Sequence, residues 1–553
     1  MEVTANKLFN YIRCRRFAAL NDANSPTDSL KYNNYYQKNI SKFKDIFLGL
    51  NFYDKLSYVK DINYTYDFHH DFTLSEDYDF IFNDKDIYIL ISASSKEFLK
   101  LKYKFASHTH QLFKKNSQGH YQLDKSGKNS VNYQQKLNKL FAKNEISGQV
   151  ILKYAFMQYL YKNVFPKKEF NLYFVLINEE YVHDGIAYTD KLYHIFDFSN
   201  LDDLDNKIEI SLFRMINHIE LNDFTPCELE RNACLRGKQL QCKFVDFCYS
   251  HLPKENSIFD YFNPHLGFKE KLKKTYIHHD IYELLNEGYI KMEDIPMDWL
   301  KNKNRLMQRY CLDNNVTYIN KEKINIILSH LKYPLVFLDL SYMPIIIPKF
   351  KHEKPFDNIS FQYSLFTQKE NEKIDLDSDS YLHNFKESRS DNRNEFAEKF
   401  VNDVLRYDSS IIVYKKPQII KILQGSKSIF PHLKSKLEII IDRVVDILDI
   451  LKIDPKFFKD LNIKNVDLST YNFYDNKLSG SYSRSKLAKV FNFEKINDLT
   501  INDDKTEYKI FRLFNDNDES TKDKLKRDMM IYSKHKAYLL YKIIDKLKQM
   551  IST

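Results

Sequence analysis

The chain has 553 residues, enough for two or three domains with hydrophobic cores of their own. Hydrophobic residues make up 43% of the sequence and charged residues 29%, as is typical of folded globular proteins. The longest apolar runs are far shorter than the roughly 18 residues of a membrane span. The first residues carry charges throughout and lack the apolar stretch of a secretory signal. We therefore expect a cytoplasmic protein without a membrane partner.

The net charge is +9, from 84 basic and 75 acidic residues. This excess is compatible with a nucleic-acid partner, but it is too small for a chain of this length to establish one. Only 10 glycines and 1 tryptophan accompany 40 tyrosines, a bias that indicates an AT-rich genome. The interleaved tyrosines and lysines of residues 31–39 could otherwise indicate a surface that stacks on nucleic-acid bases, but the biased composition is the simpler explanation.

The first part of the chain, residues 1–255, predicts a mixed α/β domain. Thr4 is placed to cap a first helix, and residues 78–82 and 87–94 form an expected β-hairpin around a polar turn. The polar segment 96–147 is expected to be a helical insertion or a mobile loop. A helix and two strands should follow, at residues 151–162, 170–177 and 192–198. This order implies a mixed sheet covered by helices.

Residues 256–332 are expected to form a helical connector, because their pattern is helical with breaks rich in lysine and asparagine. A second α/β domain, residues 333–553, opens at residues 333–340, whose near-continuous apolar run is typical of a strand buried on both faces. Residues 409–416 predict a second such strand. Residues 525–547 predict a long C-terminal helix.

Six cysteines are present, and in a cytoplasmic protein their clustering indicates metal or redox chemistry more than disulfides. Cys234, Cys242 and Cys248 share one polar segment, with seven and then five residues between them. The C-x-x-C pairs of a zinc knuckle are missing, and wide spacing with a remote fourth thiolate, Cys14, suits an iron–sulfur cluster. Unlinked cysteines remain the alternative on spacing alone, and Cys311 is expected to be an ordinary buried thiol.

Several segments resemble a bacterial family catalogued as domain of unknown function 2779. The most specific is the cysteine segment QCKFVDFCYSHLP, followed by SIFDYF. The other segments are INEEYVHDGIAYTDKLYHIFDFS, YPLVFLDL, ISFQYSLF and GSYS, at residues 177–199, 333–340, 359–366 and 480–483. The resemblance implies a RecB-like PD-(D/E)XK nuclease domain with an AddB-type iron–sulfur staple, fused to a DnaQ-like domain of the ribonuclease H fold.

By that resemblance the cluster ligands are Cys14, Cys234, Cys242 and Cys248, and the cofactor is a 4Fe-4S cluster, with zinc as the alternative. Cys234 and Cys242 are spaced two residues wider than the family pattern, so Cys227 is the substitute candidate. The staple would close a loop of more than 200 residues, and the entropic cost of loop closure grows only slowly with length.

A PD-(D/E)XK site needs an aspartate on the first hairpin strand and Glu-x-Lys on the second, where the carboxylates hold Mg²⁺ and the lysine orients water. Asp79 is placed for the first position, although it also fits an ordinary surface aspartate near a turn. Ser92 and Ser94 stand where the family has its glutamate and lysine. Lys96 lies two residues further on, too far to substitute unless the strand contains a bulge. Gln158 matches the family's glutamine in the following helix.

A DnaQ-like site uses Asp-x-Glu on its first strand and two further aspartates to hold two metal ions. Asp339 supplies the first aspartate, Ser341 replaces the glutamate, and Asp446 stands at an expected acidic position. Lys536 stands where the final aspartate is expected, on the apolar stripe of the C-terminal helix. Its ammonium is expected either to extend to water or to fill the vacated metal site and pair with Asp339 or Asp446.

These losses predict a nuclease-derived iron–sulfur protein that binds nucleic acid through distributed phosphate contacts, with both metal-dependent nuclease sites degraded. One alternative is an active DNA or RNA nuclease that uses Mg²⁺ or Mn²⁺ with acids from elsewhere in the chain. The other is a non-catalytic scaffold in a protein complex.

Overall fold

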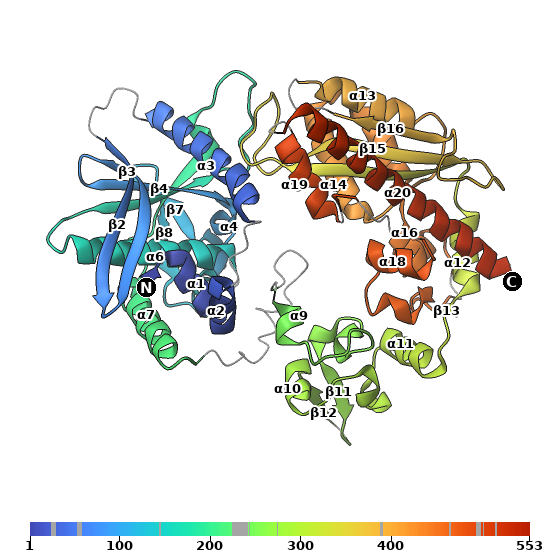
Figure 1. Ribbon diagram of the computed structural model, residues 1–553, viewed down its shortest axis with the longest axis horizontal. Coiled ribbons are helices and arrows are strands. Elements are labelled where there is room, and N and C mark those ends of the chain that lie inside the picture. The colour runs from blue at the N-terminus through green and yellow to red at the C-terminus, as the bar shows by residue number, and fades with distance from the viewer. Residues whose placement is uncertain are drawn as a thin grey trace. The chain divides into compact units, whose positions relative to one another are not determined.

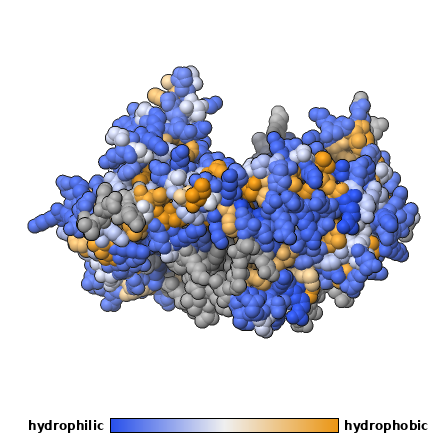
Figure 2. Space-filling model, turned by 90° about the horizontal axis from the view of Figure 1, so that it is seen from above, coloured by the Kyte–Doolittle hydropathy of each residue, from blue (hydrophilic) through white to orange (hydrophobic). Residues whose placement is uncertain are grey.

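The computed structural model describes residues 1–23, 29–51, 58–142, 145–223, 242, 244–273, 275–386, 391–463, 466–493, 499–501, 503–514 and 517–552. The chain forms two compact units (Figure 1). Unit 1 contains Met1–Tyr249 and Ile345–Phe356, and unit 2 contains Ser250–Pro344 and Asp357–Thr553. Hydrophilic residues cover most of the face drawn in Figure 2, where hydrophobic residues gather in small patches. Within the described ranges, every helix is too short or too polar to cross a membrane.

Unit 1 is built on a mixed eight-stranded sheet in the order β1–β3–β4–β9–β10–β8–β7, with β2 paired to β3. The strands are β1 (Glu2–Val3), β2 (Tyr58–His69), β3 (Phe72–Phe82), β4 (Asp86–Ser94), β7 (Phe113–Lys115), β8 (Tyr121–Leu123), β9 (Asn171–Ile177) and β10 (Tyr193–Asp197). β4 is antiparallel to β3 and parallel to β9, and β9 is antiparallel to β10. The expected hairpin and mixed sheet are therefore confirmed.

Helices cover both faces of this sheet. The helices of unit 1 are α1 (Ala5–Arg13), α2 (Arg15–Ala23), α3 (Ser29–Asn51), α4 (Lys96–Leu99), α5 (Val131–Leu140), α6 (Ile146–Val164), α7 (Leu204–Glu220) and α9 (Val245–Cys248). The buried hydroxyl of Tyr78 in β3 donates to the Met157 carbonyl of α6 at 2.6 Å. On the other face, Phe43 and Phe47 of α3 lie in a core cluster with Phe80. The side chains of β3 therefore change faces between Tyr78 and Phe80.

The first helix begins as predicted and is interrupted at Cys14. The Thr4 hydroxyl accepts a hydrogen bond from the backbone of Lys7 at 3.2 Å, which confirms Thr4 as the N-cap. Cys14 is extended, with φ −167° and ψ 117°. Because this conformation interrupts the helix, α1 ends at Arg13 and α2 begins at Arg15.

The prediction for residues 96–147 was wrong over most of its length. Helices α4 and α5 occur there, but so do β7, β8, β5 (Lys102–Phe105) and β6 (His108–Gln111). The pairs β5–β6 and β7–β8 are antiparallel. Strands this short hold too few residues for an alternating pattern to emerge from a polar sequence.

A segment of the chain that leaves unit 2 between two of its strands belongs to unit 1. This returning segment, Ile345–Phe356, packs on the turn that follows β9. The backbone of His183 donates to the Glu353 carbonyl at 3.0 Å, and the Tyr188 hydroxyl donates to the Pro348 carbonyl at 2.7 Å. Ile347 is buried among the aromatic residues of unit 1.

Unit 2 contains a five-stranded sheet in the order β16–β15–β14–β17–β18. The strands are β14 (Leu335–Pro344), β15 (Asn358–Gln368), β16 (Tyr381–Phe385), β17 (Ile411–Val413) and β18 (Val444–Asp446). The first three are antiparallel neighbours, whereas β17 is parallel to β14 and β18 is parallel to β17. Val336 and Leu338 of β14 lie in one core cluster and Leu335 and Phe337 in another, which confirms burial on both faces.

Helices pack on both faces of this sheet (Figure 1). The helices of unit 2 are α10 (Ile281–Asn286), α11 (Lys303–Asn314), α12 (Lys321–Ser329), α13 (Arg393–Val404), α14 (Lys416–Ile429), α15 (Lys434–Arg443), α16 (Ile447–Leu451), α17 (Pro455–Asp460), α18 (Arg484–Val490), α19 (Asp504–Leu513) and α20 (Glu519–Ser552). Helix α20 contains the predicted C-terminal helix and extends beyond it at both ends. Its contacts with β14 and β15 place its buried stripe on the sheet.

The predicted helical connector, residues 256–332, lies within unit 2. It contains α10, α11 and α12, but also the hairpin of β11 (Phe268–Lys271) and β12 (Tyr276–His279). A further strand, β13 (Tyr318–Ile319), pairs with β19 (Phe473–Tyr474). The buried guanidinium of Arg305 donates to the carbonyls of Phe262, Asn263 and Gly267. These bonds hold the chain before β11 in a fixed conformation.

Candidate functional site

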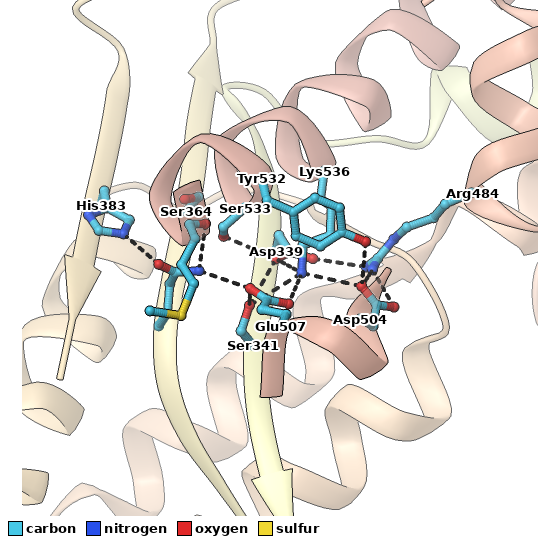
Figure 3. Close-up of polar contacts among 12 residues, drawn as sticks. Asp339, Ser341, Ser364, His383, Arg484, Asp504, Glu507, Tyr532, Ser533 and Lys536 are labelled. Carbon is cyan, nitrogen blue, oxygen red and sulfur yellow. Dashed lines mark hydrogen bonds and ion pairs between the residues drawn. The ribbon is translucent and has the colours of Figure 1, made fainter. Parts of the chain in front are cut away.

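The site in unit 2 begins on β14, where Asp339 and Ser341 are both buried. Successive side chains of a strand point to opposite faces, and Leu338 and Leu340 contribute to the core beneath α13, α14 and α15. Asp339 and Ser341 therefore point to the opposite face, towards α19 and α20 (Figure 3). The strand therefore brings a carboxylate and a hydroxyl to the same group of buried polar atoms.

The ammonium of Lys536, in α20, lies among three carboxylates. Its Nζ atom is 3.0 Å from Oδ2 of Asp339, 2.7 Å from Oε2 of Glu507 and 3.4 Å from Oδ1 of Asp504 (Figure 3). Only 7% of the Lys536 side chain is exposed. The predicted pairing of Lys536 with Asp339 is therefore confirmed, and the alternative in which the ammonium extends to water is wrong.

Two of these acids were not identified from the sequence. Asp504 and Glu507 lie three residues apart in α19, so they share one side of that helix. Oε1 of Glu507 accepts hydrogen bonds from the Ser341 hydroxyl at 2.6 Å and from the Gln362 amide at 3.0 Å. The paired acids on an amphipathic helix were the available signal, but nothing local indicated that this helix packs beside β14.

Arg484, in α18, supplies a second cation. Its Nη2 atom donates to Oδ1 of Asp339 at 2.9 Å, and its Nη1 atom lies 2.9 and 3.0 Å from the two oxygens of Asp504. The Ser533 hydroxyl donates to Oδ2 of Asp339 at 3.1 Å. Both oxygens of Asp339 therefore accept hydrogen bonds from protein groups. We call Asp339, Arg484, Asp504, Glu507 and Lys536 the ion-pair cluster.

Burial and neighbouring charges act in opposite directions on these groups. Burial alone would lower the pKa of Lys536, but the carboxylates of Asp339, Glu507 and Asp504 outweigh it, and the pKa is raised above its ordinary value. Burial raises the pKa of Glu507 and exceeds the opposing effect of Lys536. Burial would also raise the pKa of Asp504, but Arg484 and Lys536 hold it well below its usual range. The lysine therefore stays charged, and Glu507 takes up a proton more readily than Asp504.

The ammonium makes the carboxylate contacts that a bound cation would make at this position. A buried carboxylate without a countercharge is strongly destabilising, and Lys536 supplies that charge from the protein itself. Within the part of the chain that the structure describes, no group of three or more His, Cys, Asp or Glu side chains is arranged to hold a metal ion.

Asp446, the third predicted acid of unit 2, has a different role. It ends β18 and accepts hydrogen bonds from the backbone N–H groups of Lys415, Lys416 and Leu448, at 3.1, 2.8 and 3.0 Å. Asp446 therefore caps α16 and holds the start of α14. These three partners are not members of the ion-pair cluster.

In unit 1, Asp79 lies at the point where β3 begins to pair with β4. Its Oδ1 atom is 2.6 Å from the ammonium of Lys44 in α3, and its Oδ2 atom accepts a hydrogen bond from the backbone of Leu90 at 2.7 Å. Burial alone would lower the pKa of Lys44, but Asp79 and Asp61 raise it above its ordinary value. A lysine is therefore also paired with the predicted acid of unit 1.

Ser94 and Lys96, which were considered for the second half of the predicted site, both contact Glu179, which follows β9. The pairing of β4 with β9 is irregular between Ile91 and Ser94, so the bulge considered for this strand is present. The Ser94 hydroxyl nevertheless donates to Glu179 at 2.5 Å. The ammonium of Lys96 pairs with the same glutamate and is 3.6 Å from Glu180, with 56% of its side chain exposed.

Gln158 of α6 donates through its amide to Oδ1 of Asp205 in α7 at 3.0 Å. The carbonyl of the neighbouring Met157 accepts a hydrogen bond from the Tyr78 hydroxyl. Tyr78 lies on the face of the sheet opposite to Asp79 and Lys44. The structure therefore assigns Gln158 to the contact between two helices and does not bring it to Asp79.

Two of the predicted cluster cysteines lie on segments that contact each other within unit 1. Cys14 separates α1 from α2, and its sulfur accepts a hydrogen bond from the backbone of Phe17 at 3.4 Å. Cys248 is the last residue of α9. The rings of Phe17 and Phe244 are 5.5 Å apart, and the Arg16 guanidinium lies 5.5 Å from the ring of Phe247. Residues more than 200 positions apart in the sequence are thus brought together.

The remaining cysteines differ in their surroundings. Cys242 is partly buried, as are Cys14 and Cys248. Cys234 and its substitute Cys227 lie outside the described residues. Cys311 is fully buried in unit 2, where burial raises the pKa of its thiol to about 11. A thiol in this state resists ionisation, as expected for a structural cysteine.

Residues 336–483 match a family model described as a domain of unknown function (DUF2779). The match includes Asp339, Ser341 and Asp446, and it ends one residue before Arg484. It agrees with the resemblance that the motifs indicate for this part of the chain. No curated protein and no solved structure matches the chain.

The first prediction concerns the central cation. Lys536→Met keeps a long side chain but leaves three carboxylates facing one guanidinium, so we expect the free energy of unfolding to fall by about 3–5 kcal/mol. Lys534→Met is the matched control, because Lys534 pairs with Asp377, whose side chain is 93% exposed. Loss of such a pair should cost at most about 1 kcal/mol. Chemical denaturation measures both changes, and similar losses would contradict the central role of Lys536.

The second prediction concerns Asp449, near the start of α16. Burial and the charges of Asp446 and Asp454 raise its pKa to about 6. Since the folded-state pKa exceeds the unfolded value, the stability contributed by this group is present below about pH 4 and is lost as the pH rises through about 6.

Asp449→Asn, which stays neutral, should therefore increase the free energy of unfolding by about 1–2 kcal/mol near pH 8, and the gain should shrink towards zero near pH 4. Asp442→Asn, at an exposed position of α15, is the control and should give no such gain. Denaturation curves across this pH range test the prediction, and a gain independent of pH would refute it.

Proposed function

We propose that this chain is a nuclease-derived iron–sulfur protein that binds nucleic acid. Its two metal-dependent nuclease sites are degraded and no longer catalyse cleavage. The observation that carries the proposal is the position of the Lys536 ammonium, 3.0 Å from Asp339 and 2.7 Å from Glu507. A two-metal site needs carboxylates that are open to the ions. Here their charge is met by a lysine and an arginine.

The resemblance gives unit 2 its proposed DnaQ-like, ribonuclease-H-fold character. Two features support it: a mixed sheet whose first strand carries the buried Asp339, and a final helix that delivers residue 536 to that aspartate. In a working site of this type, an acid is expected at the position of Lys536. The exchange of that acid for a lysine reverses the charge at the place where the metal ions would be held.

The proposed PD-(D/E)XK character of unit 1 is supported by Asp79, which lies where β3 begins to pair with β4 and accepts a hydrogen bond from the backbone of Leu90. The carboxylate of Asp79 pairs with Lys44. Serines, Ser92 and Ser94, occupy the positions where the family has a glutamate and a lysine. A single aspartate that is already neutralised is a poor ligand for a hydrated divalent cation. Loss of acids in both units favours binding without cleavage.

The residues around Cys14 and Cys248 fit the proposed cluster in two respects. The ring contact between Phe17 and Phe244 brings the segment after Cys14 beside the segment before Cys248, and the backbone N–H of Phe17 donates to the Cys14 sulfur, as occurs for cluster thiolates. Cys14, Cys242, Cys248 and Cys234 would hold the group. When bound, it would supply a covalent link between the two ends of unit 1.

A second candidate function is an active nuclease. It is favoured by Asp504 and Glu507, two acids that reach Asp339 from α19 although the sequence motifs do not include them. Displacement of the Lys536 ammonium would leave three carboxylates near one point. This candidate therefore predicts metal-dependent cleavage that requires these acids.

Purified protein should bind labelled DNA or RNA with an affinity that falls as the salt concentration rises, and it should leave both intact when Mg²⁺ or Mn²⁺ is added. Absence of binding at low salt would reject the proposal in favour of a scaffold in a protein complex. Cleavage that disappears in Asp339→Asn would establish the second candidate instead.

The replacement of metal by lysine has a separate test. Lys536→Asp, alone or combined with Ser341→Glu, gathers acids without a central cation, so Mn²⁺ should raise the melting temperature of these variants but not that of the wild type. Lys534→Asp, elsewhere on α20, is the control for a charge change on the same helix. Equal Mn²⁺ effects on all four proteins would contradict the replacement.

The cluster is tested by anaerobic purification with an absorption spectrum and iron, sulfide and zinc analysis. We expect a brown protein that contains iron, and loss of colour in Cys14→Ser and Cys248→Ser because each change removes a ligand. Cys311→Ser is the control and should keep the colour, since Cys311 is buried in unit 2. Zinc in place of iron would retain a metal staple and reject the iron–sulfur assignment.

A further inference from the structure

The β11–β12 hairpin of unit 2 presents one of its faces to water. Lys269 lies opposite His278, and Lys271 lies opposite Tyr276. Residues directly opposite each other in an antiparallel pair project from the same face, and all four residues are exposed. We call Lys269, Lys271, Tyr276 and His278 the hairpin face. Tyr276 keeps 59% of its surface exposed.

The opposite face of the hairpin anchors it to the rest of unit 2. Phe268 is buried beneath the guanidinium of Arg305, which lies 4.7 Å from the ring. His279 contacts Glu270 at 3.1 Å and stacks on Trp299 at a ring separation of 4.0 Å. The hairpin is therefore held in place by contacts that leave the hairpin face uncovered.

One ring of the hairpin face is itself fixed by the backbone. Nε2 of His278 donates a hydrogen bond to the carbonyl of Leu266 at 2.9 Å. Gly267 between them has φ +62°, and a Cβ atom there would lie 2.8 Å from Cε1 of His278. The glycine therefore permits the close approach of the ring to the backbone, so that the imidazole is positioned before any partner binds.

The charge on this side of the hairpin is positive. Lys273, in the turn, adds a third exposed lysine to Lys269 and Lys271. Glu270, the acidic residue of the two strands, lies on the opposite face with His279. Within the described parts of the chain, no carboxylate forms an ion pair with these three ammonium groups. Exposed lysines between exposed rings complement a polyanion that also carries aromatic surfaces.

We propose that the hairpin face binds single-stranded nucleic acid, with Lys269 and Lys271 contacting phosphates and Tyr276 stacking on a base. This inference rests on the proposed nucleic-acid binding and names the surface responsible for it. A single strand fits better than a duplex because its bases expose the flat faces that an aromatic ring needs, and paired bases do not. A protein partner would need acidic groups to meet the three lysines and gives no role to the exposed ring.

The experiment measures binding of the full-length protein to a fluorescently labelled single-stranded oligonucleotide by anisotropy, at several salt concentrations. Lys269→Ala/Lys271→Ala should weaken binding about tenfold and reduce the slope of log affinity against log salt by about 1.4, because each lost phosphate contact contributes about 0.7. Tyr276→Ala should weaken binding about tenfold without changing the slope, and Tyr276→Phe should bind like the wild type because its ring is retained.

Lys456→Ala/Lys459→Ala is the control, because it removes two exposed lysines from α17 in the same unit. It should change affinity less than about twofold if binding is confined to the hairpin face. Circular dichroism of each variant verifies the fold. Duplex DNA of the same length should compete at least about tenfold more weakly than the single strand.

The outcomes separate this inference from the proposed function. If the wild type binds oligonucleotides and the hairpin variants bind as it does, the inference is wrong and nucleic-acid binding stands at another surface. If the wild type binds no nucleic acid, both the inference and the proposed function are wrong. Equal competition by duplex, or an effect of Tyr276→Phe as large as that of Tyr276→Ala, would reject base stacking.

Discussion

The ammonium of Lys536 is the contact on which the polar interior of unit 2 depends. β14, α19 and α20 each bring a charged side chain to the same buried point, and the attraction between these charges exceeds the penalty of burying them only while the lysine is present. Its long aliphatic stem lies on the apolar stripe of α20, so one residue serves both the core and the ion-pair cluster. Arg484 supports the same carboxylate from α18.

The two units have reached the same electrostatic arrangement with different elements. In unit 1 a lysine of α3 pairs with Asp79 of β3, and in unit 2 a lysine of α20 pairs with Asp339 of β14. In each case a strand aspartate expected to bind metal is neutralised by a cation from a neighbouring helix. Such pairs keep the carboxylate acceptable in a folded interior, while the charge that would attract a divalent ion is already compensated.

Much of this arrangement could be predicted from the sequence where the signal is local. The apolar run of β14, the hairpin of β3 and β4, and the position of Lys536 on an apolar stripe all follow from side-chain periodicity. Asp504, Glu507 and Arg484 could not be assigned, because their function arises from contacts between residues far apart in the chain. Likewise, Asp446 has the acidic character that the motif requires, but three backbone N–H groups use its oxygens for capping.

Because of the returning segment, Ile345–Phe356, unit 1 is not one continuous stretch of the sequence. The polypeptide passes from one unit to the other after Tyr249, after Pro344 and again after Phe356. A fragment ending near residue 255 would lack the carbonyl that receives Tyr188 and the apolar side chain of Ile347. Ribosomal synthesis therefore cannot complete unit 1 until more than half of the chain has been made, and unit 1 must wait for the part of unit 2 that ends with β14 before it can fold completely.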